Sequence, residues 1–322
     1  MTIALHVDQE RAEGMLGASE AAAVLGVDRY KSPISVWRRH RGLTVPGDGE
    51  ESEPAYWGTV LEGIIRGHYA IKSKRVVLVP RLSTTLDGWL RCTPDGISAP
   101  ATSIAEPQTL QMRGAYTPGD ALPILHEVGA PVDDDSDVGG LQVKTCDARL
   151  RDEWRDGAPA AYEVQCRVEM AVTGLPWTDI VCLCGGNAYI GPWRIYRDLA
   201  IEARILETLR EFWDMVKTGR EPSVDHTEAW RLHVSEKLGR AEPVIVEADN
   251  EMRATLERWR DARTDRLRAE RIEEQTKNEI LLRMSNAGAT RIDAGEIGRV
   301  TAYRTSGGTW ALKAPAMWKD DK

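Results

Sequence analysis

Apolar residues recur with a helical period in three long stretches of the chain. In residues 53–73 they occupy positions 57, 60, 61, 64, 65 and 69, which lie on one face of a helix. Residues 160–174 and 199–219 are amphipathic in the same way, and Gly219 is suited to end the second of these helices. The pattern therefore predicts three substantial helices that each bury one face.

Shorter helices are predicted near the N-terminus, and a longer one near the C-terminus. Ser19 stands before an Ala-rich run and predicts a helix start, while Pro33 begins a second short helix that stops at Gly42. Residues 249–286 form a long charged helix whose apolar spacing is too irregular for a sustained heptad seam. Its role in oligomerisation or partner binding stays open.

Runs rich in β-branched residues alternate with these helices and predict strands. Residues 75–96 indicate two strands, and single strands are expected in residues 139–147, 178–186 and 192–198. A β-hairpin-like unit is expected in residues 289–312. The order of helices and strands predicts a mixed α/β core.

The same pattern suggests how the chain is divided. Residues 1–222 are predicted to form the core, interrupted by an inserted loop at 98–139 that is rich in Pro, Gly, Ala and Asp. Residues 223–248 are expected to be a linker, and residues 249–322 a C-terminal extension made of the long helix and the hairpin.

Composition places the chain among globular proteins, with 42% hydrophobic and 29% charged residues. No run of about 18 apolar residues predicts a membrane span, and no secretory signal is apparent, so a cytoplasmic location is expected. The five cysteines lack metal-ligand spacing and are expected to be buried, reduced thiols.

The net charge of −8, taken alone, opposes nucleic-acid binding, which Lys and Arg drive. Its distribution is uneven, because residues 29–41 are basic without a single acid, whereas residues 47–53 and 133–137 are acidic. Enzymes that cut DNA also need carboxylates to hold metal ions. The charge therefore permits DNA binding, with Arg38 and Arg39 as candidate contacts, or a solvated basic surface.

The chemistry centres on CTPDG at residues 92–96 and LQVKT at 141–145. Hydrolysis of a phosphodiester needs carboxylates for Mg²⁺, an activated water and a positive charge near the phosphate. Asp95 at a strand end and Lys144 on the next strand supply these groups, and Lys144 shares a strand face with residue 142. Alone, each motif is weak, since Asp95 could simply be a turn residue before Gly96.

Further motifs follow in a fixed order. WGTVLEG places Glu62 on the helix before the strands, and AAYEVQ places Tyr162 and Gln165 on one helix face. Together with LGASEAAAVLG and KSPISVWRRHRG, this series resembles the phage lambda exonuclease and YqaJ-like viral recombinase family, within the PD-(D/E)XK nuclease superfamily. The resemblance runs over roughly residues 15–222.

The resemblance implies a restriction-endonuclease-like core, with a mixed central sheet flanked by helices, and a metal-dependent 5′→3′ exonuclease. Glu62, Asp95, Gln142 and the Val143 carbonyl would bind Mg²⁺, which Mn²⁺ could replace, and Lys144 would orient the attacking water or stabilise the transition state. Tyr162 and Gln165 would position the nucleic acid and the lysine. Contacts to the DNA end would come from Ser19, Thr93 and Arg11.

The resemblance also implies partners. Double-stranded DNA ends would be the substrate, the protein would form a ring-shaped homotrimer, and a phage single-strand annealing protein would use the product. A phage-encoded protein of this kind would work in the cytoplasm of a bacterial host.

One departure stands at residue 142, where the family usually has Glu or Asp and this chain has Gln. An amide oxygen can coordinate Mg²⁺ but brings no charge. Acids of the insert could compensate (Asp133, Asp134, Asp135 and Asp137). The alternatives are a DNA-end-binding recombination scaffold with weak or lost nuclease activity, and a related endonuclease.

Overall fold

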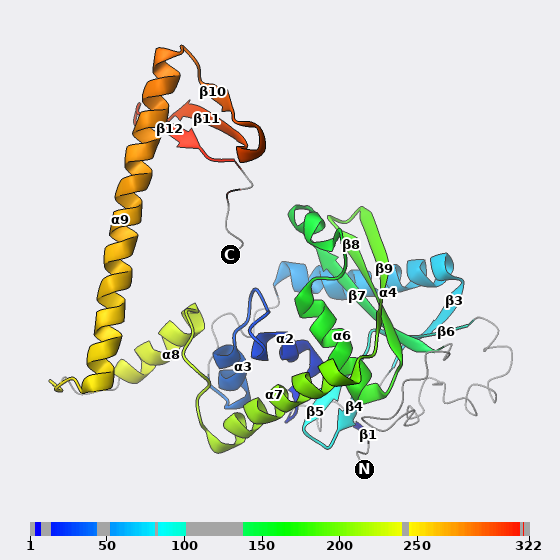
Figure 1. The fold of residues 1–322 in the computed structure, drawn as a ribbon. Coiled ribbons are helices and arrows are strands. Elements are labelled where there is room, and N and C mark those ends of the chain that lie inside the picture. Colours follow the sequence, from blue (N-terminus) through cyan, green and yellow to red (C-terminus); the bar gives the residue numbers. More distant parts are fainter. Residues whose placement is uncertain are drawn as a thin grey trace. The chain divides into compact units, whose positions relative to one another are not determined.

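The computed structural model describes residues 4–7, 14–43, 52–80, 83–100, 138–239, 245–315 and 318. The chain divides into two compact units, Met1–Arg240 and Ala241–Lys322. Most of the predicted insert and Arg11 lie outside the described residues. Figure 1 shows the elements of both units.

The first unit is a mixed α/β structure, as predicted. Its strands are β1 (Ala4–Val7), β2 (Leu16–Gly17), β3 (Arg75–Leu78), β4 (Ser83–Leu86), β5 (Leu90–Cys92), β6 (Gly96–Pro100), β7 (Gly139–Cys146), β8 (Trp177–Cys184) and β9 (Ala188–Tyr196). Its α-helices are α2 (Ala21–Val24), α3 (Pro33–His40), α4 (Glu53–Ser73), α6 (Ala160–Thr173), α7 (Leu199–Thr218) and α8 (Glu228–Leu238). Among its described residues, the unit also contains the 3₁₀ helices η1 (Ala18–Glu20) and η3 (Ala148–Trp154).

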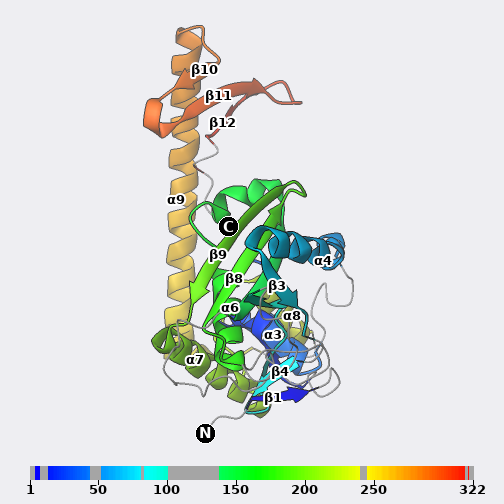
Figure 2. The ribbon, with the colours of Figure 1, turned by 90° about the vertical axis from the view of Figure 1, so that its right-hand side faces the viewer.

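The central sheet has five strands in the order β3-β6-β7-β8-β9. β7 pairs with β8 in parallel, and the other neighbours are antiparallel, so the sheet is mixed and β7 is its middle strand. Alternate residues of β7 face opposite sides of the sheet. Leu141 and Val143 pack against Ile65 and Tyr69 of α4, whereas Gln142 reaches Glu169 of α6. The two helices therefore cover opposite faces (Figures 1 and 2).

A second, smaller sheet has the order β1-β4-β5-β2. Leu16 and Leu90 from this sheet are fully buried beside Ile34 of α3 and Leu209 of α7. This cluster is the largest apolar core of the unit, and α6 contributes to it through Val168. Helix α6 thus packs on both sheets, which fixes its position relative to the strands that carry the candidate site.

The structure corrects several predicted boundaries. Residues 75–96 form three strands rather than two, because a turn at Asp87 and Gly88, both with positive φ, separates β4 from β5. Ser19 lies inside η1 and caps no helix; the backbone of Gly17 takes the N-cap position. The predicted linker contains α8, which buries Trp230 and His233, so the part of that range up to residue 238 belongs to the first unit.

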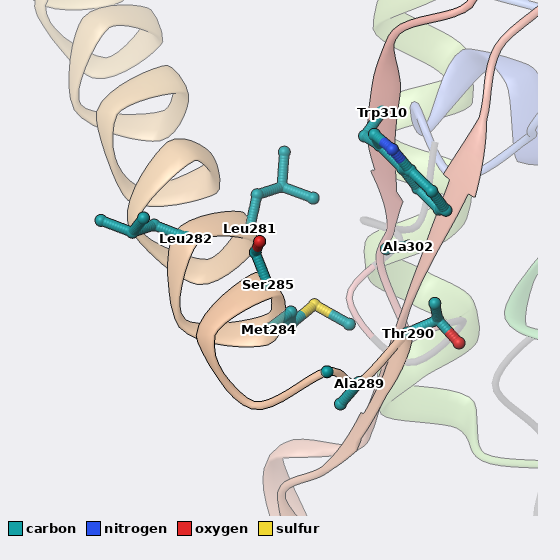
Figure 3. A pocket seen from close by; sticks show the side chains of 9 residues that line it. Leu281, Leu282, Met284, Ser285, Ala289, Thr290, Ala302 and Trp310 are labelled. Carbon is teal, nitrogen blue, oxygen red and sulfur yellow. The ribbon is translucent and has the colours of Figure 1, made fainter.

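The second unit consists of α9 (Asn250–Asn286), η4 (Gly295–Ile297) and an antiparallel sheet of β10 (Arg291–Asp293), β11 (Arg299–Arg304) and β12 (Trp310–Lys313). The predicted hairpin is β11–β12, and β10 extends it to three strands. Met284 is buried beneath this sheet, next to a cavity of about 470 Å³ between the helix end and Trp310 (Figure 3).

Two further expectations concern the thiols and membranes. All five cysteines are free; Cys146 is half-buried and the other four are buried. Among the described residues, no helix combines the length and the apolar character needed to cross a membrane.

Candidate active site

Asp95 lies directly before β6, beside the middle strand of the sheet. Its Oδ2 accepts a hydrogen bond of 2.8 Å from the backbone amide of Val143. The next residue must be glycine, because a Cβ at Gly96 would stand 2.4 Å from Cγ1 of Val77. Close strand packing therefore requires glycine at residue 96.

Glu62 is brought to Asp95 by Arg66, one turn further along α4. The Nη1 of Arg66 donates to Glu62 Oε1 at 2.7 Å and to the backbone carbonyl of Asp95 at 2.6 Å. The Glu62 side chain is one-third exposed, so it reaches solvent at the edge of the site. A single guanidinium thus links the helix acid to the strand that carries Asp95.

Lys144 stands two residues beyond Gln142 on β7, on the face covered by α6. Its Nζ lies 5.4 Å from the ring centroid of Tyr162, within range of a cation–π contact. The Tyr162 ring stacks in turn on the buried Trp154, with centroids 5.4 Å apart. Burial raises the pKa of Tyr162 to about 12, so the phenol stays neutral near neutral pH.

A network of two amides and one carboxylate covers the same face. Gln142 Nε2 donates to both oxygens of Glu169, at 2.9 and 2.8 Å. Gln165 Nε2 donates to Glu169 Oε1 at 2.9 Å and to Gln142 Oε1 at 3.3 Å. Tyr162 and Gln165, the two residues predicted to lie on one face of this helix, are therefore accompanied on α6 by a third residue of the site, Glu169.

Burial dominates the electrostatics of these acids. Burial, and then the charge of Asp95, raise the pKa of Glu169 to about 7, although the hydrogen bonds of Gln165 and Gln142 and the charge of Lys144 act to lower it. Burial also raises the pKa of Asp95, as does the charge of Glu62, while Lys144 and the Val143 amide act in the opposite direction. The charges of Lys144 and Glu62 thus act on Asp95, and the charges of Asp95 and Lys144 act on Glu169.

The candidate DNA contacts are more scattered. Thr93 is exposed near Asp95 and shares a hydrogen bond of 2.7 Å with Ser83, and Ser19 is exposed in η1. Arg39 is partly exposed and donates to Glu20 at 3.2 Å. None of these three contacts the acids described above among the interactions of the described residues, so their role in DNA binding stays a prediction.

Arg38 is a correction to the sequence analysis. Its side chain is 1% exposed and is bonded to His233 Nδ1 and to Glu236 of α8, both at 2.8 Å. The prediction that Arg38 contacts DNA is wrong for this structure, because its guanidinium ties α3 to α8. Its partners lie 195 and 198 positions away, so no local pattern could reveal this.

Mg²⁺ prefers hard oxygen ligands, and the site offers carboxylates and amide and carbonyl oxygens of this kind. One carboxylate oxygen of Asp95 accepts a hydrogen bond from the Val143 amide. The charge of Asp95 also acts on the buried carboxylate of Glu169. In the described part of the chain, no three His, Cys, Asp or Glu side chains are grouped closely enough to hold a metal ion. The donor chemistry fits a divalent cation, with Asp95 as its best-placed carboxylate.

Glu169 is the residue that the sequence analysis missed. A signal was present, because Tyr162, Gln165 and Glu169 are spaced by three and four residues and so share one helix face. An acid is unusual between two buried residues such as Val168 and Met170, because a buried carboxylate needs a hydrogen-bond or charge partner.

A mixed sheet with Asp95 before one strand, Lys144 on the next and helices on both faces defines a restriction-endonuclease-like α/β core. The chain belongs to the YqaJ-like viral recombinase domain family, whose sequence profile matches residues 8–176. The matched range includes every residue of the candidate site.

Individual proteins show more distant similarity. The uncharacterized protein YqaJ of Bacillus subtilis (strain 168) is 25% identical over 238 residues, which are 72% of this chain and 63% of that protein. This chain thus spans less than two-thirds of that relative's length. Among solved structures, the alkaline exonuclease LHK-Exo from Laribacter hongkongensis matches 71% of this chain and 97% of its own, with 18% identity and a TM-score of 0.45. Its complex with dAMP matches with 19% identity over 71% of this chain and 96% of its own, at a TM-score of 0.42. Similarities at this level do not define what this chain does.

Proposed function

We propose that this protein is a Mg²⁺-dependent exonuclease that digests linear double-stranded DNA in the 5′→3′ direction and leaves a 3′ single strand. One observation carries the proposal, within a domain of the YqaJ-like family. The carboxylate of Asp95 is held by the Val143 amide on β7, and the charge of Lys144, the next residue of that strand, acts on it. Mn²⁺ would substitute for Mg²⁺, because both ions accept carboxylate and water ligands.

In this proposal each residue has a distinct task. Asp95 and Glu62 supply carboxylate oxygens for the cation, with the Val143 and Gln142 oxygens as further donors. A bound Mg²⁺ would lower the pKa of a water molecule and polarise the phosphate. Lys144 stabilises the negative charge that builds up on the phosphate or orients the attacking water. Tyr162 holds the lysine at its ring face.

The substrate and product define the partners. Exposed Ser19, Thr93 and Arg39 would contact the DNA end, with Tyr162 and Gln165 nearer the scissile phosphate. A 3′ single strand is the substrate of strand annealing, so a single-strand annealing protein of phage recombination would follow. A ring-shaped homotrimer around the DNA, in the bacterial cytoplasm, would complete the assembly.

Digestion of linear duplex labelled at either the 5′ or the 3′ end tests this function. We expect early release of the 5′ label, dependence on Mg²⁺ or Mn²⁺, and no cleavage of covalently closed circular DNA. Lys144→Ala is the control for contaminating nuclease, because it removes the ammonium group that the proposal requires.

Two outcomes would replace the proposal. Cleavage of closed circles would identify an endonuclease. Binding of linear DNA without release of nucleotides in either metal would identify an end-binding scaffold, in which Gln142 marks lost chemistry.

A further inference from the structure

Glu169 is a buried carboxylate whose neighbouring cation, Lys144, is only half-buried and forms no ion pair with it among the described residues. It is 3% exposed, and among the described residues it forms hydrogen bonds but no ion pair. A buried charge needs a counter-charge, or the group must take up a proton. The charge of Asp95, a half-buried acid held by the Val143 amide, also acts on Glu169. Two carboxylates whose charges interact in this way favour a cation between them.

The orientation of Gln142 shows which residue carries the charge. A carboxylate only accepts hydrogen bonds, so the amide group of Gln142 must face Glu169 with its NH₂. Its Oε1 then accepts from Gln165 at 3.3 Å. Gln142 therefore holds Glu169 through its NH₂ group, while its Oε1 accepts one hydrogen bond and keeps a second lone pair for the cation.

Glu169 keeps free capacity to bind. A carboxylate has about four acceptor positions. In the described part of the structure, Oε1 accepts from Gln142 and Gln165, and Oε2 accepts only from Gln142, at 2.8 Å. One position on Oε2 is thus left for a further ligand.

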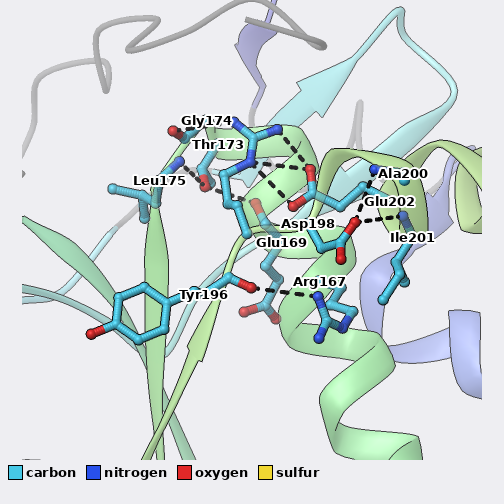
Figure 4. Close-up of polar contacts among 11 residues, drawn as sticks. Arg167, Glu169, Thr173, Gly174, Leu175, Tyr196, Asp198, Ala200, Ile201 and Glu202 are labelled. Carbon is cyan, nitrogen blue, oxygen red and sulfur yellow. Dashed lines mark hydrogen bonds and ion pairs between the residues drawn. The ribbon is translucent and has the colours of Figure 1, made fainter. Parts of the chain in front are cut away.

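The backbone beneath Glu169 is firmly fixed. Thr173 Oγ1 donates to the carbonyl of Glu169 at 2.7 Å, and the amide of Leu175 donates to the same hydroxyl at 3.3 Å (Figure 4). The buried Arg197 pairs with Glu202 at 2.6 Å and donates to the carbonyl of Gly174, where α6 ends. The end of α6 is therefore anchored to β9 and α7, which gives the side chain a defined position.

We propose that Glu169 is a metal-binding carboxylate of this site, in place of the acid that the family usually has at residue 142, and that Gln142 and Gln165 position it. In this chain the strand carries the amide, Gln142, and the helix carries the acid, Glu169. This inference deepens the proposed function and rests on it for the role of the metal. It assigns the half-buried Asp95 and the buried Glu169 as two carboxylates that neutralise the cation.

Mn²⁺ binding to the full-length protein tests the inference without relying on activity. Titration calorimetry or electron paramagnetic resonance would measure the affinity of wild type, Glu169→Gln and the exchange variant Gln142→Glu/Glu169→Gln. Glu163→Gln is the matched control, since it makes the same change on the same helix at a half-exposed acid paired with Arg167. Circular dichroism would confirm folding of each variant.

We expect Glu169→Gln to bind Mn²⁺ at least about tenfold more weakly. The exchange variant should recover most of the affinity, and Glu163→Gln should match wild type. Unchanged Mn²⁺ affinity in folded Glu169→Gln would overturn the inference. If Glu169→Gln alone does not fold, the exchange variant decides: wild-type affinity supports the inference and loss of affinity refutes it.

Failure of the proposed function gives a different result. Wild-type protein that binds Mn²⁺ through Glu169 but releases no nucleotides would refute the exonuclease and leave the metal ligand in place. The converse result is also distinguishable. If wild type digests DNA, and folded Glu169→Gln keeps both its Mn²⁺ affinity and its digestion of DNA, only the role of Glu169 is refuted.

Discussion

The backbone amide of Val143 donates a 2.8 Å hydrogen bond to the carboxylate of Asp95, across 48 positions of sequence. Val143 lies between Gln142 and Lys144, so one short stretch of the middle strand positions the acid, the amide and the lysine. Its own side chain packs on the opposite face, against α4. The register of β6 on β7 therefore determines the geometry of the candidate site.

Asp95→Asn should abolish nuclease activity without unfolding the protein. The amide oxygen of Asn can still accept from Val143, but the charge that attracts the metal is lost. We expect the rate of nucleotide release to fall by about 10²–10³-fold, a loss typical of removing one electrostatic contact in an active site. Because burial raises the pKa of Asp95, loss of the charge should not lower the metal-free unfolding temperature.

Asp152→Asn is the control, since it makes the same change at an exposed side chain in η3. A folded Asp95→Asn protein that digests linear DNA at the wild-type rate would contradict this assignment.

Substitutions at Tyr162 separate its ring from its hydroxyl. If the ring face holds Lys144, Tyr162→Phe should keep most of the activity, whereas Tyr162→Leu should lose it. A cation–π contact stabilises by about 0.5–2 kcal/mol, so the expected loss is roughly 2- to 30-fold. Single-turnover digestion at saturating DNA measures the step. Equal losses in both variants would instead assign the role to the hydroxyl.

The sequence was most informative where the periodicity was strong. Three elements were predicted close to their observed bounds. They are α4, from its long apolar stripe, β7, from its run of β-branched residues, and α6, from its helical period. The prediction for residues 75–96 gave two strands where the structure has three. Only the turn at Asp87 and Gly88 separates the short strands β4 and β5. A local pattern of residues therefore predicts that a strand or helix exists better than it predicts where one short strand ends and the next begins.

The site was predicted only in part for a related reason. Asp95 and Lys144 belong to motifs that read along a strand, so their proximity could be expected. The burial of Arg38 depends on α8, almost two hundred positions later, and the partnership of Gln142 with Glu169 depends on packing of a helix on a sheet. Such contacts are set by tertiary structure.

Gly96→Ala should destabilise the protein through one identified clash. The new Cβ would lie 2.4 Å from Cγ1 of Val77 and about at contact distance, 3.5 Å, from Leu141. Overpacking of this kind costs about 1–3 kcal/mol. Adding Val77→Ala removes the opposing methyl groups, so the double variant should regain part of the loss. Urea unfolding of the two single variants and the double variant measures the coupling, and strictly additive losses would exclude the clash.

Arg38→Ala should affect stability rather than DNA affinity. It removes the buried guanidinium that bonds to His233 and Glu236; because Glu236 is about half-exposed and His233 keeps its contact with Glu221, the expected cost is about 1–3 kcal/mol. Lys31→Ala, at an exposed residue of the same basic segment, removes the same charge and should leave stability nearly unchanged. DNA affinity of folded Arg38→Ala, measured by fluorescence anisotropy below its unfolding temperature, should equal that of Lys31→Ala. A much greater loss of affinity in Arg38→Ala would return this arginine to the DNA interface.

Glu20 should make stability depend on acid pH. Burial by itself would raise the pKa of Glu20, but the hydrogen bond and charge of His40, the Gly17 amide and Arg39 lower it below the ordinary value of 4.5. A carboxyl group with a lowered pKa in the folded state stabilises the protein fully above its unfolded pKa, and this contribution is lost as pH falls through the folded value. Glu20→Gln should therefore be less stable than wild type by about 1–2 kcal/mol near pH 6, and the difference should shrink below about pH 4. Thermal unfolding of both proteins between these pH values measures the difference, with Glu228→Gln as a control at an exposed ion pair. A stability difference that is independent of pH would show that Glu20 acts through packing rather than through its charge.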